Sequence, residues 1–209
     1  MIEFINKTNI DQRTIKKANS ILEDGGLVAF PTETTWCICC STASSTATEK
    51  LRRLKGTFHK YTLTIMCESI SQASDLAEID NNAFRIVKQY APGPYVFILN
   101  AKKNIIKITG INKPDIGIRI PSNNIPIELI NFHGKPLFTI AASKQMGSLD
   151  WWDSEFAENN LFQYGYELED IKQIDLILDD SEALEKNLTT VINLTNGVPE
   201  LIRQGLGVF

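Results

Sequence analysis

Residues 25–40 read GGLVAFPTETTWCICC, in which a glycine pair leads into an apolar run, a polar corner and then a cysteine-rich run. The two apolar runs are typical of buried strands, so the polar residues lie at a corner between them. Such corners usually use Gly, Asn or Asp, whereas the branched side chain of threonine restricts its torsions. The threonines therefore indicate hydrogen-bonding side chains, with their general preference for strands as the alternative explanation.

The composition is that of an ordinary globular protein. The chain has 209 residues, of which 43% are hydrophobic and 22% charged, and its formal net charge is -4. This balance argues against a broadly basic surface that coats nucleic acid, while a local basic patch stays open. The first residues lack the pattern of a signal peptide, and no apolar run is long enough to span a bilayer. We therefore expect a cytoplasmic protein without a membrane partner.

The four cysteines are expected to be free thiols in that compartment. Cys37, Cys39 and Cys40 lie close together, but the chain has no C-x-x-C spacing of the kind that zinc sites use. In a strand, Cys37 and Cys39 share one face and Cys40 points to the other. Small buried hydrophobic residues are the favoured interpretation, so no metal-ligating residues are assigned.

Helical and strand patterns alternate early, and strand patterns dominate late, which predicts one α/β domain over residues 1–209 with a mixed sheet. Asp11 is expected to cap the first helix, and Thr46 with Glu49 to form a capping box on the second. Residues 143–170 are less regular. Helices are predicted over 12–24, 46–55, 71–77, 81–90 and 124–131, and strands over 27–30, 62–67, 91–100, 116–121, 137–142, 174–179 and 189–195, with an extended piece over 199–205.

Eight blocks of the sequence carry a family resemblance. In order they are GGLVAFPTETTW, LKG, APGPYVFIL, IGIRIPSN, PLFTIAAS, IDLILD, TTVINLT and LIRQG. The chain resembles the YrdC-like domain family from about residue 12 to residue 207, and TLTIMC and IRIPSN look closest to its YciO-like branch. The resemblance implies an open, twisted mixed sheet with flanking helices around a concave cavity that holds ATP.

The family includes the bacterial synthases that make threonylcarbamoyl-adenylate for a tRNA modification. The resemblance therefore implies L-threonylcarbamoyladenylate synthase-type activity, in which ATP, L-threonine and bicarbonate give the adenylate and pyrophosphate. Such a transfer depends mostly on positioning and on positive charge around the phosphates, with Mg²⁺ expected alongside ATP.

Lys55 is the expected catalytic residue. It ends the basic segment EKLRRLK and matches the lysine of the family's K-x-R motif. The alternative is structural, because the macrodipole favours a cation near a helix C-terminus by about 0.3–1 kcal/mol.

Two arginines in apolar strand segments are the expected phosphate ligands. Arg119 lies within IGIRIP and Arg203 within LIRQG. A buried arginine needs a partner, and guanidinium fits phosphate well, with a core salt bridge as the alternative. Hydroxyl groups that the resemblance places at the substrate or nucleotide are those of Thr32, Thr35, Ser143, Thr189 and Thr190, with Glu33 at an acidic position.

The chain departs from the family's catalytic signature. The K-x-R motif reads Lys55-Gly56-Thr57, and the S-x-N motif reads Ala141-Ala142-Ser143. Losing one preorganised donor costs a factor of about 10²–10³ in rate at better-studied sites. Synthase activity should thus be much reduced unless another cation reaches the cavity; the candidates are Arg53, His59, Lys60 and Lys144.

Other residues have more than one interpretation. Cys37 and Cys39 replace glycines expected from the family, and they either narrow the cavity or repack the core. The two histidines, His59 and His133, are expected to face solvent, and Trp151 and Trp152 to cover the core.

Two main functions remain open from the sequence, and a third, hydrolysis of an adenylate, rests only on the expected cavity and ranks last. The first is a slow synthase. The second is a non-catalytic module that binds a nucleotide or RNA, either tRNA or double-stranded RNA, through the basic stretch 50–60.

Overall fold

The computed structural model describes residues 1–55, 63–103, 105, 114–146 and 158–209. Its strands are β1 (Ile2–Phe4), β2 (Val28–Pro31), β3 (Trp36–Ser41), β4 (Thr64–Met66), β5 (Ala77–Glu78), β6 (Tyr95–Ala101), β7 (Asp115–Arg119), β8 (Leu137–Ala141), β9 (Leu176–Asp179), β10 (Thr190–Asn193) and β11 (Glu200–Arg203). Its helices are α1 (Gln12–Glu23), α2 (Ser45–Lys55), α3 (Ile70–Leu76), α4 (Asn81–Tyr90) and α6 (Asn124–His133), with 3-10 helices η1 (Glu158–Asn160) and η2 (Gly165–Leu168). Predictions that lie outside the described residues concern Gly56, Thr57, His59, Lys60, Trp151 and Trp152.

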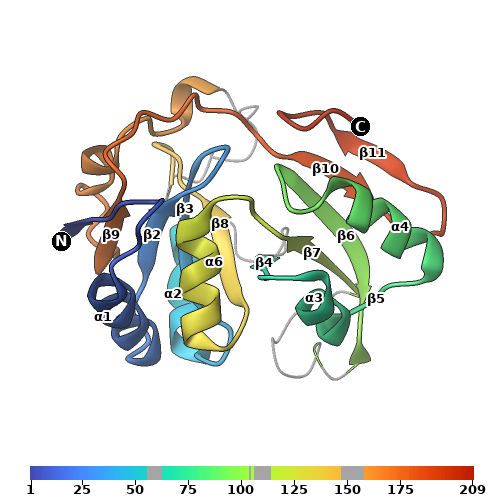
Figure 1. Cartoon of the computed structure of the whole chain (residues 1–209), viewed down its shortest axis with the longest axis horizontal. Coiled ribbons are helices and arrows are strands. Elements are labelled where there is room, and N and C mark those ends of the chain that lie inside the picture. The colour runs from blue at the N-terminus through green and yellow to red at the C-terminus, as the bar shows by residue number, and fades with distance from the viewer. Residues whose placement is uncertain (56–62, 104, 106–113, 147–157) are drawn as a thin grey trace.

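The strands form one open sheet in the described part of the chain (Figure 1). Its order is β1-β9-β2-β3-β8-β4-β7-β6-β10-β11, and β5 pairs with β6. Four neighbouring pairs are parallel, namely β1–β9, β9–β2, β4–β7 and β6–β10. The other pairs are antiparallel. The predicted mixed α/β fold with an open sheet and flanking helices is therefore confirmed.

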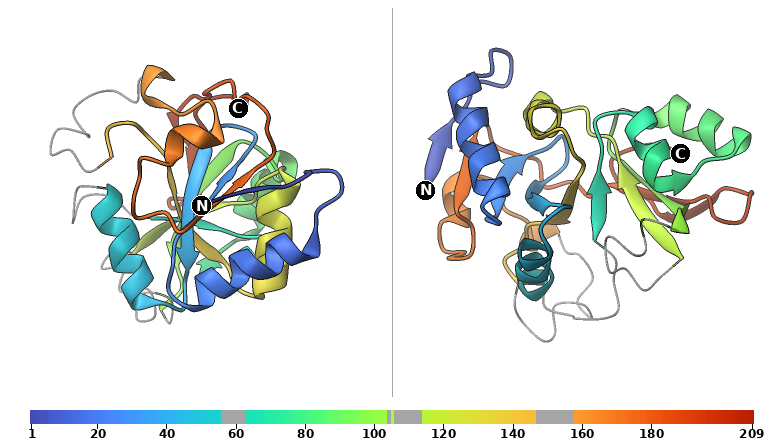
Figure 2. Two further views of the ribbon diagram at one scale, coloured as in Figure 1. Left: turned by 90° about the vertical axis from the view of Figure 1, so that its left-hand side faces the viewer. Right: turned by 90° about the horizontal axis from the view of Figure 1, so that it is seen from below.

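Helices cover both faces of the half of the sheet that contains β2, β3 and β8. α1 and α6 pack on each other and on β2, while α2 packs on β3 and β8. Figure 2 shows α6 and α2 on opposite sides of these strands. In the described residues, no helix is long and apolar enough to cross a bilayer.

The cysteine-rich strand β3 is apolar on both sides because both of its faces are covered. Cys37 and Cys39 lie in the core beneath α1 and α6, and Cys40 lies in the core on the α2 side. All four cysteines are free and buried. Burial raises the pKa of Cys40 and of Cys67 to about 12, so both are neutral thiols near neutral pH. The prediction of free, buried thiols is confirmed.

The helix caps that the sequence predicted were partly correct. Asp11 caps α1 as predicted, its carboxylate accepting a backbone N–H. α2 begins one residue earlier than predicted, and Ser44 Oγ accepts the backbone N–H of Ala47 at 3.2 Å. The predicted capping box of Thr46 with Glu49 is therefore wrong. Strands β1 and β5 were not predicted, because runs of three and two residues carry too little alternation to be recognised.

His133 does not face solvent as the sequence suggested. It is partly buried at the end of α6, where its Nδ1 lies 2.6 Å from Asn19 Oδ1 and its Nε2 lies 2.8 Å from Ser41 Oγ. The side chain therefore links α6 to α1 and to β3. Burial, followed by the nearby charge of Lys135, lowers the pKa of His133, while Glu23 acts in the opposite direction.

This environment predicts a loss of stability in mild acid. Because the pKa of His133 is lower in the folded than in the unfolded chain, its contribution is complete above the unfolded value of about 6.5. That contribution is lost as the pH falls through this value toward the folded pKa. Urea denaturation between pH 8 and pH 5 should show a smaller decline for His133→Gln than for the wild type. Equal declines for the wild type and His133→Gln would contradict this role of His133.

Candidate functional site

The polar corner that joins β2 to β3 is held by the hydroxyl of Thr32. Pro31 pairs with Trp36 in the ladder, and Thr32 to Thr35 form the connection. Thr32 Oγ1 donates to Thr35 O at 2.7 Å and accepts the backbone N–H groups of Thr34 at 3.2 Å and Thr35 at 3.3 Å. None of these residues has a positive φ. A side-chain hydroxyl thus stabilises a corner that needs no glycine.

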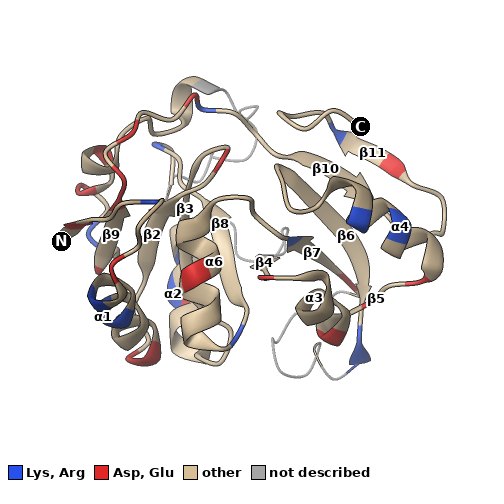
Figure 3. Ribbon diagram, viewed as in Figure 1, with Lys and Arg blue, Asp and Glu red and all other residues tan. Residues whose placement is uncertain are grey.

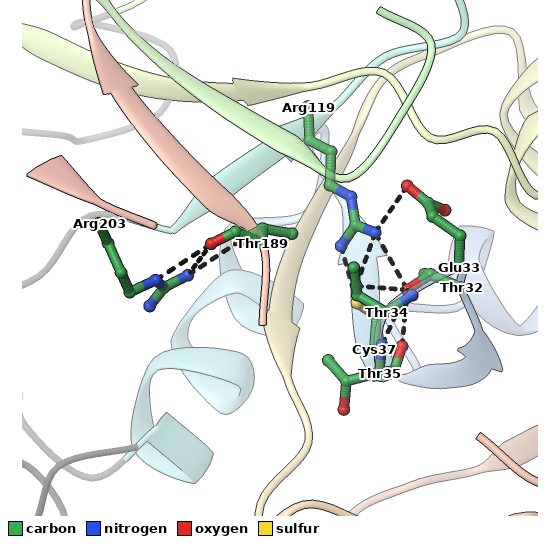
Figure 4. A network of polar contacts seen from close by, with 8 residues as sticks. All are labelled: Thr32, Glu33, Thr34, Thr35, Cys37, Arg119, Thr189 and Arg203. Atoms are coloured by element: carbon green, nitrogen blue, oxygen red, sulfur yellow. Dashed lines mark hydrogen bonds and ion pairs between the residues drawn. The ribbon is translucent and has the colours of Figure 1, made fainter. Parts of the chain in front are cut away.

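Arg119 is the buried cation at this corner. It ends β7, is 4% exposed, and its Nη2 donates to Thr32 Oγ1 and Glu33 Oε1 at 3.0 Å and to Thr34 Oγ1 at 2.9 Å (Figure 4). Its Nη1 lies 3.9 Å from Cys37 Sγ. The salt bridge with Glu33 is the alternative that the sequence left open for Arg119. Binding of phosphate by Arg119 stays a prediction.

The corner also gathers buried polar atoms without partners. Within the described residues, three side-chain atoms are buried and make no hydrogen bond: Glu33 Oε2, Thr35 Oγ1 and Arg119 Nε. Such atoms are rare in folded proteins, and each one calls for a water, a ligand or a catalytic role. All three belong to the corner and to the arginine that binds it, which marks this place as a candidate binding site.

Arg203 and Thr189 form a second network. Nε and Nη2 of Arg203 donate to Thr189 O at 3.1 and 2.9 Å, and Nη2 also donates to Thr189 Oγ1 at 2.9 Å (Figure 4). Burial lowers the pKa of Arg203 from its ordinary value. Thr190 Oγ1 donates to Gly207 O at 2.5 Å and accepts the Gly205 N–H at 2.9 Å. These hydroxyls hold the C-terminal segment against β10.

The two arginines lie on one face of the sheet. Val191 of β10 pairs with Arg203 of β11 and with Val96 of β6. In the antiparallel pairing of β6 with β7, Phe97 lies opposite Ile118, so the next residues along, Val96 and Arg119, face each other. Arg119 therefore lies in the same row across the sheet as Val191 and Arg203. Paired residues project to the same side, and three strand spacings correspond to about 14 Å between the two arginine backbones. The topology therefore brings both arginines to one face, in separate networks.

Predicted site residues line two of the cavities in the described part of the chain, and the larger of these has a volume of about 890 Å³. Ser143 lines it, and so do Arg53 and Lys144, two of the cations considered as replacements in the altered signature. Lys55 ends the same helix as Arg53 but is not among the described lining residues. The other lining residues are Lys50, Leu54, Met146, Phe162, Tyr166, Glu167, Asp170, Ile171 and Gln173.

The second cavity lies at the polar corner and has a volume of about 410 Å³. Thr32 and Glu33 line it together with an acidic segment that the sequence reasoning missed, which contributes Asp180, Glu182 and Glu185. Burial raises the pKa of Asp180. The run DDSEALE was visible in the sequence, but its position beside Glu33 depends on the fold. In Figure 3, acidic and basic positions are interspersed along the ribbon.

The fold and the site define an α/β protein with an arginine-bound threonine corner and, among the residues that the structure describes, cavities of small-molecule size at that corner and beside α2. The family model for Sua5, YciO and YrdC proteins, described as "Telomere recombination", matches residues 20–205. The chain therefore belongs to the Sua5/YciO/YrdC family.

Relatives agree with this assignment. The uncharacterized protein YciO of Escherichia coli (strain K12) is 33% identical over 98% of this chain and 95% of its own length. The crystal structure of E. coli YciO matches with a TM-score of 0.85, covering 100% of this chain and 97% of that one. The threonylcarbamoyl-AMP synthase of Pyrococcus abyssi is 26% identical over 95% of this chain and 56% of its own length. Sua5 of P. abyssi complexed with L-threonine has the same fold, with a TM-score of 0.81 at 24% identity over 98% of this chain and 57% of that one.

The buried pair of Arg119 with Glu33 predicts a large cost of mutation. Arg119→Met should lower the free energy of unfolding by about 3 kcal/mol, because Glu33 and two threonine hydroxyls lose their donor in a buried place. Lys7→Met is the control, since the ion pair of Lys7 with Glu182 is more than one third exposed and contributes about 0–1 kcal/mol. Urea denaturation measures both, and equal costs would show that the corner does not depend on Arg119.

Proposed function

We propose that this protein binds ATP and an α-amino acid and has threonylcarbamoyl-adenylate synthase-type activity. In that reaction the amine of L-threonine captures carbon dioxide from bicarbonate and loses a proton. The carbamate oxygen then attacks the α-phosphorus of ATP, and pyrophosphate leaves. Family membership supports this class of chemistry, and a relative of P. abyssi carries the name of the synthase.

The observation that carries the proposal is the set of unpartnered atoms at the polar corner. Glu33 Oε2 can only accept, Arg119 Nε can only donate, and the hydroxyl of Thr35 can do both. An α-amino acid offers ammonium donors and carboxylate acceptors close together, so its polarity matches these three atoms. The complex of P. abyssi Sua5 with L-threonine supports an amino acid as a ligand in the family.

The phosphates of ATP are proposed to contact the predicted site residues that the amino acid does not use. Arg203 supplies a guanidinium on the sheet face that Arg119 shares, and Lys55 supplies a cation at the end of α2. The hydroxyls in this proposal are those of Thr189, Thr190 and Ser143.

Mg²⁺ is proposed to enter together with ATP. Among the described residues, no group of three or more His, Cys, Asp or Glu side chains is arranged to hold a metal ion. At the corner, Glu33 pairs with Arg119, and Glu182 pairs with Lys7. When bound with ATP, the ion would neutralise part of the phosphate charge.

The altered signature should keep turnover slow. A protein with an intact K-x-R and S-x-N signature has an arginine where this chain has Thr57 and a serine where it has Ala141. Each missing donor predicts a rate lower by about 10²–10³.

Purified protein with ATP, L-threonine and bicarbonate should release pyrophosphate slowly, and only when threonine is present. A coupled pyrophosphate assay measures this, with a family member of intact signature as the positive control. Arg203→Met should reduce the release about tenfold or more, because a phosphate would lose a charged donor. Pyrophosphate release that does not depend on threonine would refute the synthase proposal. So would a wild-type protein that releases no pyrophosphate.

RNA binding is the second candidate function. Lys50, Arg52, Arg53 and Lys55 concentrate positive charge along α2. If tRNA or double-stranded RNA binds there, its affinity should fall steeply between 50 and 200 mM salt, because phosphate contacts release counterions. Filter binding with Arg52→Gln as a test variant and Arg85→Gln as the control measures this. Affinity that does not change with salt would argue against this function.

A further inference from the structure

Lys144 is a cation in the wall of the 890 Å³ cavity, directly after the altered S-x-N motif. Its backbone N–H donates to Asn160 O at 2.8 Å. Its Nζ lies 2.9 Å from Glu167 Oε1 and 5.8 Å from the centre of the Phe162 ring. An ion pair and a cation–π contact therefore restrain a long side chain that would otherwise sample many rotamers.

Glu167 is the third residue of η2, and its carboxylate is held by the backbone just before that helix. Its Oε2 accepts the backbone N–H groups of Gln163 at 2.7 Å and Tyr164 at 2.9 Å. Burial raises the pKa of Glu167, but the hydrogen bonds from Lys144 and from these two backbone groups outweigh it and leave the pKa below its ordinary value. Glu167 thus stays ionised and fixes the position of Lys144.

Two further cations line the same cavity from α2. Lys50 Nζ donates to Gly25 O at 3.0 Å. Arg53 Nε lies 3.2 Å from Glu49 Oε1 on an exposed part of α2. The lining thus carries three cations and two carboxylates, those of Glu167 and Asp170. Lys144 and Glu167 balance each other, and Lys50 and Arg53 remain against Asp170, so the lining side chains carry an excess of one positive charge that an anion would offset.

We propose that Lys144, positioned by Glu167, binds the anionic group of the ligand in this cavity. Together with Arg53 it supplies the positive charge that the sequence lacks at Thr57. The ligand class is a phosphate or a carboxylate, and the assignment to the reacting ligand rests on the proposed synthase-type function. A pair that only fixes η2 is the alternative, and it predicts a change in stability without a change in anion affinity.

Titration calorimetry with ATP, L-threonine and inorganic pyrophosphate tests the proposal on the whole chain. Lys144→Met should weaken binding by about 10- to 100-fold, the loss expected for one hydrogen bond to a charged group. Weaker binding of ATP and pyrophosphate identifies a phosphate, and weaker binding of threonine alone identifies a carboxylate. Lys144→Arg keeps the charge and should stay within about threefold of the wild type.

Matched variants separate position from charge. Lys172→Met removes an exposed lysine next to lining residues and should leave all affinities unchanged. Glu167→Gln should raise the KM for the affected ligand more than it lowers kcat, because Lys144 keeps its charge but loses its restraint. A denaturation curve for each variant confirms that it is folded.

The outcomes distinguish this inference from the proposed function. If Lys144→Met binds all three probes like the wild type, or if the wild type binds none of them, the anion site is wrong. If the wild type binds pyrophosphate through Lys144 but never releases it from ATP, the synthase proposal fails and the anion site stands.

Discussion

The structure depends on the contact between Arg119 and the corner that joins β2 to β3. In the sheet order, β3, β8 and β4 separate β2 from β7, and four strand spacings span about 19 Å in a flat sheet. Arg119 Nη2 nevertheless lies 3.0 Å from Thr32 Oγ1. The twist of the sheet must therefore bring the corner between β2 and β3 over the end of β7. A guanidinium that is 4% exposed requires such partners, because an unpaired buried charge is very costly.

This closure explains why a polar cavity forms beside the corner. The contact uses only part of the hydrogen-bonding capacity of Glu33 and Arg119 and leaves the hydroxyl of Thr35 unpaired. The corner is therefore rigid and at the same time incompletely satisfied, which is the condition for a preorganised binding site. The larger cavity, which residues of α2 and η2 line, carries three cations and two carboxylates and is therefore cationic on balance. Separate acidic and basic cavities suit a ligand, or a pair of ligands, that carries both kinds of charge.

Several features of the site followed from residue type, and others did not. The blocks of sequence predicted the family, and the thiols of β3 followed from an apolar run with no C-x-x-C spacing. Lys144 was one of four replacement cations in the sequence; of the two that the structure describes, Arg53 and Lys144, it is Lys144 that packs against Phe162 and Glu167. His133 was assigned to solvent because its neighbours are loop-like in sequence, whereas its real partners, Asn19 and Ser41, lie 114 and 92 residues away.

The sequence by itself determined the alternation of apolar runs, and with it the mixed sheet, the helices and the membership of the family, because periodicity and local caps act over a few residues. Only the tertiary structure decided that Glu33 is the partner of Arg119, that the acidic segment after β9 faces this corner, and that Lys144 is held by Glu167. The physical reason is that a charge selects its partner by distance and burial, and the twist of the sheet sets both of them for residues far apart in the chain.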